Sequence, residues 1–237
     1  GLGFSNAIKR GKIGIVAASG TGLQEVMCQI SNRGGGVSQA LGTGGRDVKE
    51  KVGGRMMLFC LDLLEEDENT DVIVIVSKPP SPVVTEKIKK YLEGRKKPVI
   101  ACFLGKEKET GELPWVEAST LEETADLALK YAGYADNESH RVDAEMIEKL
   151  AAEKSLLKPE QKYIRGLYCG GTLAYESLLQ IREKTGKVYS NIALSAEEKI
   201  DGKDASRENT VLDLGDDEFT VGKPHPMIEP SLREDRL

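Results

Sequence analysis

The fold is decided by the stretch Lys12-Ile13-Gly14-Ile15-Val16-Ala17-Ala18-Ser19-Gly20-Thr21-Gly22. Residues 12–18 form an apolar run with the length of a buried strand, and residues 19–22 are typical of a tight turn. Helical periodicity follows from Leu23 to Asn32. A strand that passes through a glycine turn directly into a helix predicts a sheet of parallel strands connected by helices.

The same alternation continues as far as residue 131. Residues 71–76 form a continuous β-branched run, which is typical of a parallel strand buried on both faces. We therefore predict an α/β fold with a right-handed, doubly wound parallel sheet of flavodoxin-like layout. The other expected strands span 37–41 and 98–103, and the other expected helices span 56–65, 83–92 and 120–131.

The chain is predicted to divide into three parts. Residues 1–134 form the flavodoxin-type domain, residues 135–160 a charged linker with a helix over 144–157, and residues 161–237 the start of a second α/β domain of the same kind. This second, partial unit has expected strands at 164–169 and 210–214 around a helix at 172–183. Because two parallel strands bury both sheet faces poorly, we expect the second unit to pack on another piece of protein.

The composition limits the classes of partner. The 237 residues carry a formal net charge of −6, whereas a surface that binds nucleic acid or an anionic membrane needs a basic footprint, so neither partner is expected. The chain lacks an apolar run of membrane-spanning length and a signal-peptide pattern. Four cysteines without zinc-site spacing favour reduced thiols. These features predict a cytoplasmic protein, and the start at Gly1 is consistent with a fragment.

An internal repeat is the most specific signal in the sequence. Residues 19–30 align with residues 170–181, and both copies hold a Gly-Thr pair, a glutamate one turn later and a Gln-Ile pair. Each copy follows a strand and opens a helix, where free backbone N–H groups and the helix dipole favour an anion. We therefore predict phosphate or anion binding by Ser19, Gly20, Thr21 and Gly22, and by Gly170, Gly171 and Thr172. The alternative is a tight strand-to-helix turn with a cap.

Two further places carry candidate residues. Gly44, Gly45 and Arg46 follow the second strand, where an arginine beside a glycine loop can bind a carboxylate or phosphate, or else form a surface ion pair. His225 lies between two prolines and is the catalytic candidate, as a phosphate acceptor or a general acid or base. The alternative for His225 is a loop histidine that caps a carbonyl. Residues 216–218 are interpreted as a solvated acidic turn, so we expect no metal site.

These residues resemble the α subunits of the succinyl-CoA synthetase and ATP-citrate lyase superfamily of acyl-CoA synthetases. Members carry a strand-Ser-Gly-Thr-helix element, a glycine-rich strand exit and an apolar third strand, for which this chain has residues 18–21, 41–45 and 71–76. Residues 165–173 and 213–228 resemble the FdrA-type branch in particular. The resemblance is to the ligase region and covers nearly the whole chain.

The resemblance implies chemistry at phosphate. In that family two facing helix N-termini bind the phosphate of a phosphohistidine, which moves between the CoA and nucleotide sites. This chain departs from the pattern, since residues 103–106 lack the family's Gly-His-Ala-Gly segment and residues 77–80 replace the glutamate that orients the histidine. We also find no N-terminal Rossmann domain to hold CoA.

We therefore expect a subunit or fragment of an acyl-CoA synthetase, of the acid-thiol ligase type, that handles an acyl or carbamoyl phosphate intermediate. The alternatives are a carbamoyltransferase component of ureide breakdown and a non-catalytic binding or assembly subunit. The resemblance implies CoA and ATP with Mg²⁺ as cofactors, through the full-length protein or a partner chain. A small anionic substrate and a homo-oligomer or partner subunit are expected.

Overall fold

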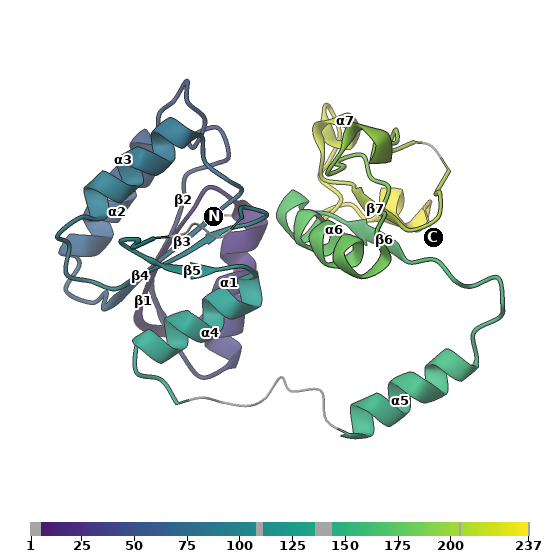
Figure 1. The fold of residues 1–237 in the computed structure, drawn as a ribbon, viewed down its shortest axis with the longest axis horizontal. Coiled ribbons are helices and arrows are strands. Elements are labelled where there is room, and N and C mark those ends of the chain that lie inside the picture. Colours follow the sequence, from purple (N-terminus) through teal and green to yellow (C-terminus); the bar gives the residue numbers. More distant parts are fainter. Residues whose placement is uncertain (1–5, 108–110, 136–143, 204, 237) are drawn as a thin grey trace. The chain divides into compact units, whose positions relative to one another are not determined.

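The computed structural model describes residues 6–107, 111–135, 144–203 and 205–236. The chain forms two compact units, residues 1–137 and residues 138–237 (Figure 1). No helix among the described residues is long and apolar enough to cross a lipid bilayer.

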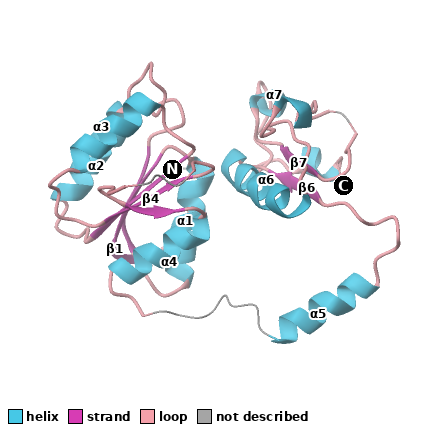
Figure 2. Ribbon diagram, viewed as in Figure 1, coloured by secondary structure: helices cyan, strands magenta, loops and turns pink. Residues whose placement is uncertain are grey.

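The first unit contains a sheet of five parallel strands in the order β2-β1-β3-β4-β5 (Figure 2). This is the predicted doubly wound, flavodoxin-like layout, in which the strand order reverses between β1 and β3. The strands are β1 (Arg10–Ala17), β2 (Val37–Gly42), β3 (Val72–Ser77), β4 (Val99–Phe103) and β5 (Val116–Ala118).

Helices cover both faces of this sheet. α1 and α4 lie together on one face, whereas α2 and α3 lie on the other (Figure 1). The helices are α1 (Gly20–Asn32), α2 (Arg55–Glu66), α3 (Pro82–Leu92) and α4 (Leu121–Tyr131). All six residues of β3 are buried, which explains why residues 72–77 are so uniformly apolar and β-branched.

The largest described core cluster lies between the sheet and the α2–α3 layer. It joins Met57, Leu61 and Leu64 of α2 to Ile73 and Ile75 of β3. The predicted elements of this unit are present, with ends that differ by a few residues. The structure differs from the prediction in two places. The short strand β5 was not predicted, and α1 begins at Gly20 rather than at residue 23.

The second unit is small. It contains α5 (Ala144–Ser155), β6 (Arg165–Tyr168), α6 (Gly171–Thr185), β7 (Thr210–Asp213), a 3-10 turn (Ala196–Glu198) and the single-turn helices α7 (Asp217–Thr220) and α8 (Ser231–Glu234). β6 and β7 pair in parallel. α5 has no buried residue, and residues 136–143 of the predicted linker lie outside the described residues.

Both faces of this two-stranded sheet carry small apolar clusters. Val211 packs with Ala174 and Leu178 of α6. Leu212, the next residue of β7, packs with Leu214 and Phe219. Both clusters consist of residues of this unit, whereas no residue of β6 is buried, and the packing of this unit on another piece of protein stays a prediction. The sequence analysis missed α7, which supplies Phe219.

Candidate functional site

The first helix start lies at the carboxyl edge of the sheet, directly after β1. Ser19 has an extended backbone (φ −116°, ψ 124°) and is the N-cap of α1. Its hydroxyl accepts a hydrogen bond of 3.0 Å from the N–H of Gly22. Gly22 therefore donates within the helix start and is buried, so its predicted contact with an anion is not supported.

Gly20 and Thr21 are the open part of this helix start. No acceptor among the described residues takes their N–H groups, as expected for the first turn of a helix. A Cβ built on Gly20 would meet no atom within 4 Å, so neither crowding nor a left-handed backbone requires glycine there. The two N–H groups and the positive end of the dipole of α1 lie at the edge where doubly wound sheets bind ligands.

The loop after β2 lies beside this helix start. The N–H of Thr43 donates to the carbonyl of Ala17 over 2.8 Å, and a Cβ on Gly45 would lie 3.8 Å from the carbonyl oxygen of Ala18. Gly44 has φ +82°, a left-handed conformation that favours glycine. The structure therefore brings Gly45 next to Ala18, the residue before Ser19.

Two cations follow the strands on either side of β1. Arg46, after β2, is exposed and forms no ion pair with a described carboxylate. Lys78, directly after β3, is also exposed. β1 pairs with both strands, and Ala17 is opposite Gly42 and Val76. The sequence analysis did not select Lys78, although a cation at the end of a buried strand beside the glycine turn was a usable signal.

Asp47, the residue after Arg46, is buried and binds the start of α2. It is 4% exposed, and its two carboxylate oxygens accept hydrogen bonds of 2.9 and 2.8 Å from the N–H groups of Met56 and Met57. Asp47 thereby caps α2, whose own N-cap residue Gly54 has no side chain. Burial, and in second place the charge of Asp47, raises the pKa of the Cys60 thiol.

The second helix start differs from the first. Its N-cap is Gly170, which has no side chain to cap α6. The carboxylate of Asp213, at the end of β7, is 5% exposed and lies against this turn: a Cβ on Gly171 would be 2.8 Å from Asp213 Oδ2. Thr172 is also buried. A carboxylate of the chain itself therefore occupies the space beside the predicted anion site at Gly170, Gly171 and Thr172.

His225 lies next to this carboxylate. The point where a Cβ of Gly215 would be is 3.0 Å from His225 Nε2 and 3.1 Å from Asp213 Oδ1. The N–H of Gly215 donates to Asp213 Oδ1 over 2.9 Å, and His225 Nδ1 accepts from the N–H of Met227 over 3.2 Å. The structure thus brings His225, Asp213 and Gly171 into one cluster within the second unit, with Gly215 allowing the close approach.

Asp213 is held rigidly. Asn191 donates from its amide to the carbonyl of Asp213 over 2.9 Å and accepts from the N–H of Asp213 over 3.0 Å. Cys169, at the exit of β6, has its pKa raised chiefly by burial. Sequence reasoning missed Asp213 as a site residue, because an acidic residue at the end of a strand gives no signal of what it will contact. Within the described ranges no group of three His, Cys, Asp or Glu side chains could hold a metal ion.

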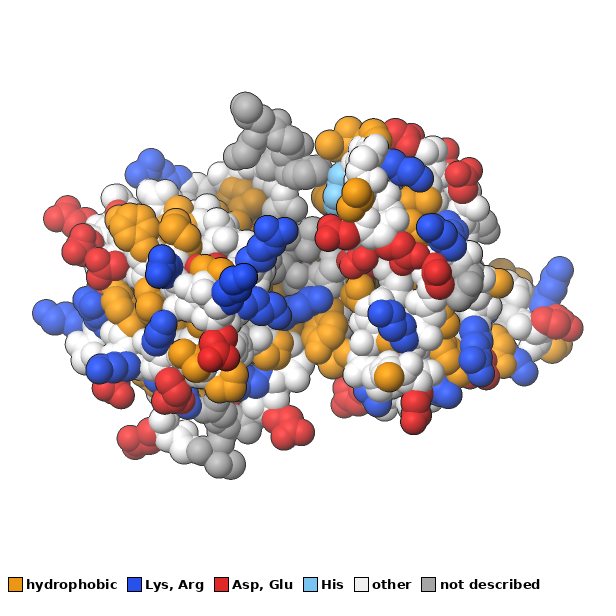
Figure 3. Space-filling model, turned by 90° about the horizontal axis from the view of Figure 1, so that it is seen from above, with side chains coloured by type: hydrophobic (Ala, Val, Ile, Leu, Met, Phe, Trp, Pro, Cys, Tyr) orange, Lys and Arg blue, Asp and Glu red, His pale blue; other side chains and the backbone are white. Residues whose placement is uncertain are grey.

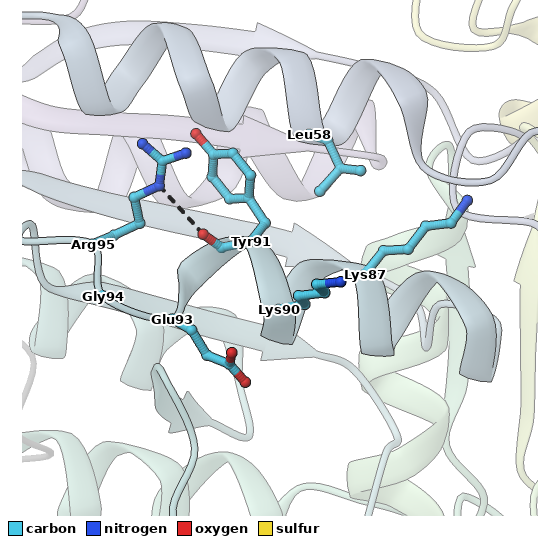
Figure 4. A pocket seen from close by; sticks show the side chains of 7 residues that line it. All are labelled: Leu58, Lys87, Lys90, Tyr91, Glu93, Gly94 and Arg95. Carbon is cyan, nitrogen blue, oxygen red and sulfur yellow. Dashed lines mark hydrogen bonds between the residues drawn. The ribbon is translucent and has the colours of Figure 1, made fainter.

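A groove of about 600 Å³ lies elsewhere in the first unit, between α2 and α3 (Figure 4). Tyr91 and Leu58 line it, and the Tyr91 hydroxyl donates to Asp62 over 2.8 Å. The guanidinium of Arg95 lies 4.3 Å from the centre of the Tyr91 ring. Because its lining comes from the second half of α3 and the loop that follows, this groove is distinct from the helix start at Gly20.

The chain is similar to known proteins over both units. Residues 8–105 match the family model described as a CoA binding domain, and residues 167–237 match the one described as CoA-ligase. The first match corrects the interpretation that the chain has no domain to hold CoA. The chain lacks the Gly-His-Ala-Gly segment that the resemblance implies after the fourth strand, but residues 8–105 match the CoA binding domain.

The curated relatives of the chain include the following three. An "uncharacterized protein YahF" of Escherichia coli is 46% identical over the whole chain and 46% of its own length. A malate–CoA ligase subunit alpha of Methylorubrum extorquens is 28% identical over 52% of this chain and 40% of its own length. A succinate–CoA ligase [ADP-forming] subunit alpha of Methanothermobacter thermautotrophicus is 31% identical over 44% of this chain and 34% of its own length.

The chain spans less than half the length of each of these relatives. None of the three names contains FdrA, so that branch stays a prediction. The two matched family models, together with two ligase α subunits among the relatives, support assignment of the chain to the superfamily of CoA ligases.

Proposed function

We propose that this chain is part of an acyl-CoA ligase subunit, in which the start of α1 binds a phosphate group of CoA. The observation that carries the proposal is the helix start itself, where the N–H groups of Gly20 and Thr21 have no acceptor among the described residues and a Cβ on Gly20 would contact no atom. The match of residues 8–105 to a CoA binding domain supports the same ligand.

The residues around this helix start fit an anionic ligand of this kind. Arg46 and Lys78 supply positive charge from the loops after the two strands that flank β1. The chain as a whole carries a formal net charge of −6. When bound, CoA supplies the thiol that accepts an acyl group. The protein's part is to hold the phosphate by backbone N–H groups, which cannot be deprotonated or move away.

His225 is the proposed catalytic residue of the second unit. The buried Asp213, whose main chain is hydrogen-bonded to Asn191, lies near His225 and would orient the imidazole. His225 would accept the phosphoryl group of an acyl or carbamoyl phosphate, with formation of an N–P bond, cleavage of the P–O bond and release of the carboxylate or carbamate, or it would accept a proton. ATP with Mg²⁺ would then be bound by the rest of the protein or by a partner subunit.

One observation favours a second candidate function, a non-catalytic binding subunit. The carboxylate of Asp213 fills the place beside the start of α6 where a second anion was expected. A negative side chain there disfavours a phosphate by electrostatic repulsion. Under this alternative the first unit binds CoA as proposed, whereas substitution of His225 leaves the activity of the assembled enzyme unchanged.

The experiment is isothermal titration of the full chain with CoA. Gly20→Val adds a branched side chain over the N–H groups and is expected to weaken CoA binding by about tenfold or more. Asn32→Val is the matched control, since Asn32 is exposed at the opposite end of the same helix, about 18 Å away. Equal affinity of Gly20→Val and Asn32→Val for CoA would contradict the proposal.

A further inference from the structure

α2 has apolar side chains on two opposite faces. Its inner face packs on the sheet through Met57, Leu61 and Leu64, each 0% exposed. Its outer face carries Met56, Phe59 and Leu63, which are 48%, 55% and 45% exposed. The spacing of three and four residues places these three on one stripe along the helix. A helix that covers a sheet normally has a polar outer face, so this stripe is unusual.

Two further apolar side chains near α2 in the chain or on the neighbouring helix are exposed. Val52, one turn before the helix, is 39% exposed, and Val83 at the start of the neighbouring α3 is 43% exposed. In the space-filling view, hydrophobic patches of the first unit, on the left, are interrupted by basic and acidic side chains (Figure 3). Clustered apolar side chains of this kind mark a binding surface, whereas single exposed ones do not.

The charges at the ends of the stripe indicate what covers it. Arg55 lies at the first residue of α2 and Glu66 at the last, and both are exposed and form no ion pair with a described residue. Phe59 lies near the midpoint of the two. An antiparallel copy of α2 would therefore set each Arg55 opposite the other copy's Glu66 and Met56 opposite Leu63, with the two Phe59 rings at the axis. A surface that is complementary to an antiparallel copy of itself is typical of a two-fold interface.

We propose that the outer face of α2 is the contact surface of a two-fold dimer with a second copy of this chain. α2 is suited to this because its inner face is fixed in the core, which leaves little conformational freedom to lose on association. α5 also exposes Met146, Ile147 and Leu150, but it has no buried residue to hold it in place. This inference does not depend on the proposed binding of CoA.

Sedimentation velocity of the full chain over a concentration series tests the proposal. The wild-type chain is expected to dimerise, and Phe59→Glu is expected to raise the dissociation constant by about tenfold or more, since it places a charge at the centre of the contact. Leu150→Glu is the control, because Leu150 is similarly exposed (59%) on α5. A monomeric wild-type chain, or a dimer that only Leu150→Glu dissociates, would overturn the proposal.

A charge exchange distinguishes a second copy from another partner. Arg55→Glu alone and Glu66→Arg alone are each expected to weaken the dimer, because like charges then meet across the axis. The double variant restores opposite charges at both ends and is expected to recover most of the wild-type affinity. If the double variant is as weak as the sum of the single changes, the antiparallel pairing of α2 is wrong.

Discussion

At the scale of the residue, Asp47 anchors the loop that lies beside the proposed binding site. The carboxylate receives two N–H groups from the first turn of α2, and the N–H of Gly54 donates to the carbonyl of Asp47 over 2.8 Å. These bonds close the loop that begins at Gly44 beside the helix start of α1. The loop therefore has a fixed anchor at its far end.

Asp47→Ala is expected to lower the free energy of unfolding by about 2 kcal/mol, because the N–H groups of Met56 and Met57 lose their acceptor. Urea denaturation followed by circular dichroism measures this. Asp71→Ala is the control, since Asp71 forms an exposed ion pair with Lys12 of 3.0 Å and should matter much less. Similar losses in both variants would show that Asp47 is not a specific cap.

Asp67 gives a prediction for pH. Hydrogen bonds from the Thr70 hydroxyl and from Asn69 lower the pKa of the Asp67 carboxyl below its ordinary value of 3.8. A lowered pKa in the folded state stabilises the fold at pH values above 3.8, and this contribution is lost as the pH falls through the folded-state pKa. Asp67 contacts water, so the contribution is small.

The stability difference between the wild-type chain and Asp67→Asn should therefore be largest near neutral pH and shrink below pH 3.8. Unfolding free energies at a series of pH values measure it. Glu68→Gln, an adjacent exposed position, controls for the loss of one negative charge. A difference that grows on acidification would have the wrong sign for this account.

At the scale of the element, the two Gly-Thr helix starts have similar sequences and different surroundings. Gly20 opens α1 with nothing within 4 Å of an added Cβ, whereas an added Cβ on Gly171 would be 2.8 Å from Asp213 Oδ2. Both glycines lack a left-handed φ, so strain of the backbone does not separate them. The comparison isolates the effect of the neighbouring carboxylate.

Gly20→Ala is expected to leave stability unchanged or to raise it by up to about 1 kcal/mol, because alanine restricts the unfolded chain. Gly171→Ala is expected to be destabilising, because the added methyl group would lie 2.8 Å from Asp213 Oδ2. The main chain of Asp213 is held by two hydrogen bonds to Asn191. Thermal unfolding of the two variants provides the comparison. Equal effects would show that Asp213 does not crowd the start of α6.

The sequence predicted the sheet of the first unit well, because residues 72–76 and 13–17 are apolar runs long enough to be unambiguous. It could not predict β5, which is three residues long and only partly buried. The repeat correctly located both helix starts. It could not show that the Asp213 carboxylate lies against the start of α6. Asp213 is about 40 residues from Gly171 in the sequence, and the repeat pattern does not predict a contact between them.

At the scale of the whole molecule, the chain combines a unit that matches a CoA binding domain with a unit that matches a CoA-ligase. The first presents an open helix start between two cations, and the second presents a histidine beside a buried carboxylate. The apolar outer face of α2 is the proposed place for a second copy.

The most direct test of the central claim is an amide-resolved NMR titration of the full chain, first with inorganic phosphate and then with CoA. The account predicts that both ligands shift the N–H resonances of Gly20 and Thr21, and that CoA, with further groups to contact, shifts additional residues of the first unit. The resonances of Gly171 and Thr172 should stay in place, because Asp213 lies against that turn. Shifts at Gly171 and Thr172 with none at Gly20 and Thr21 would contradict the account.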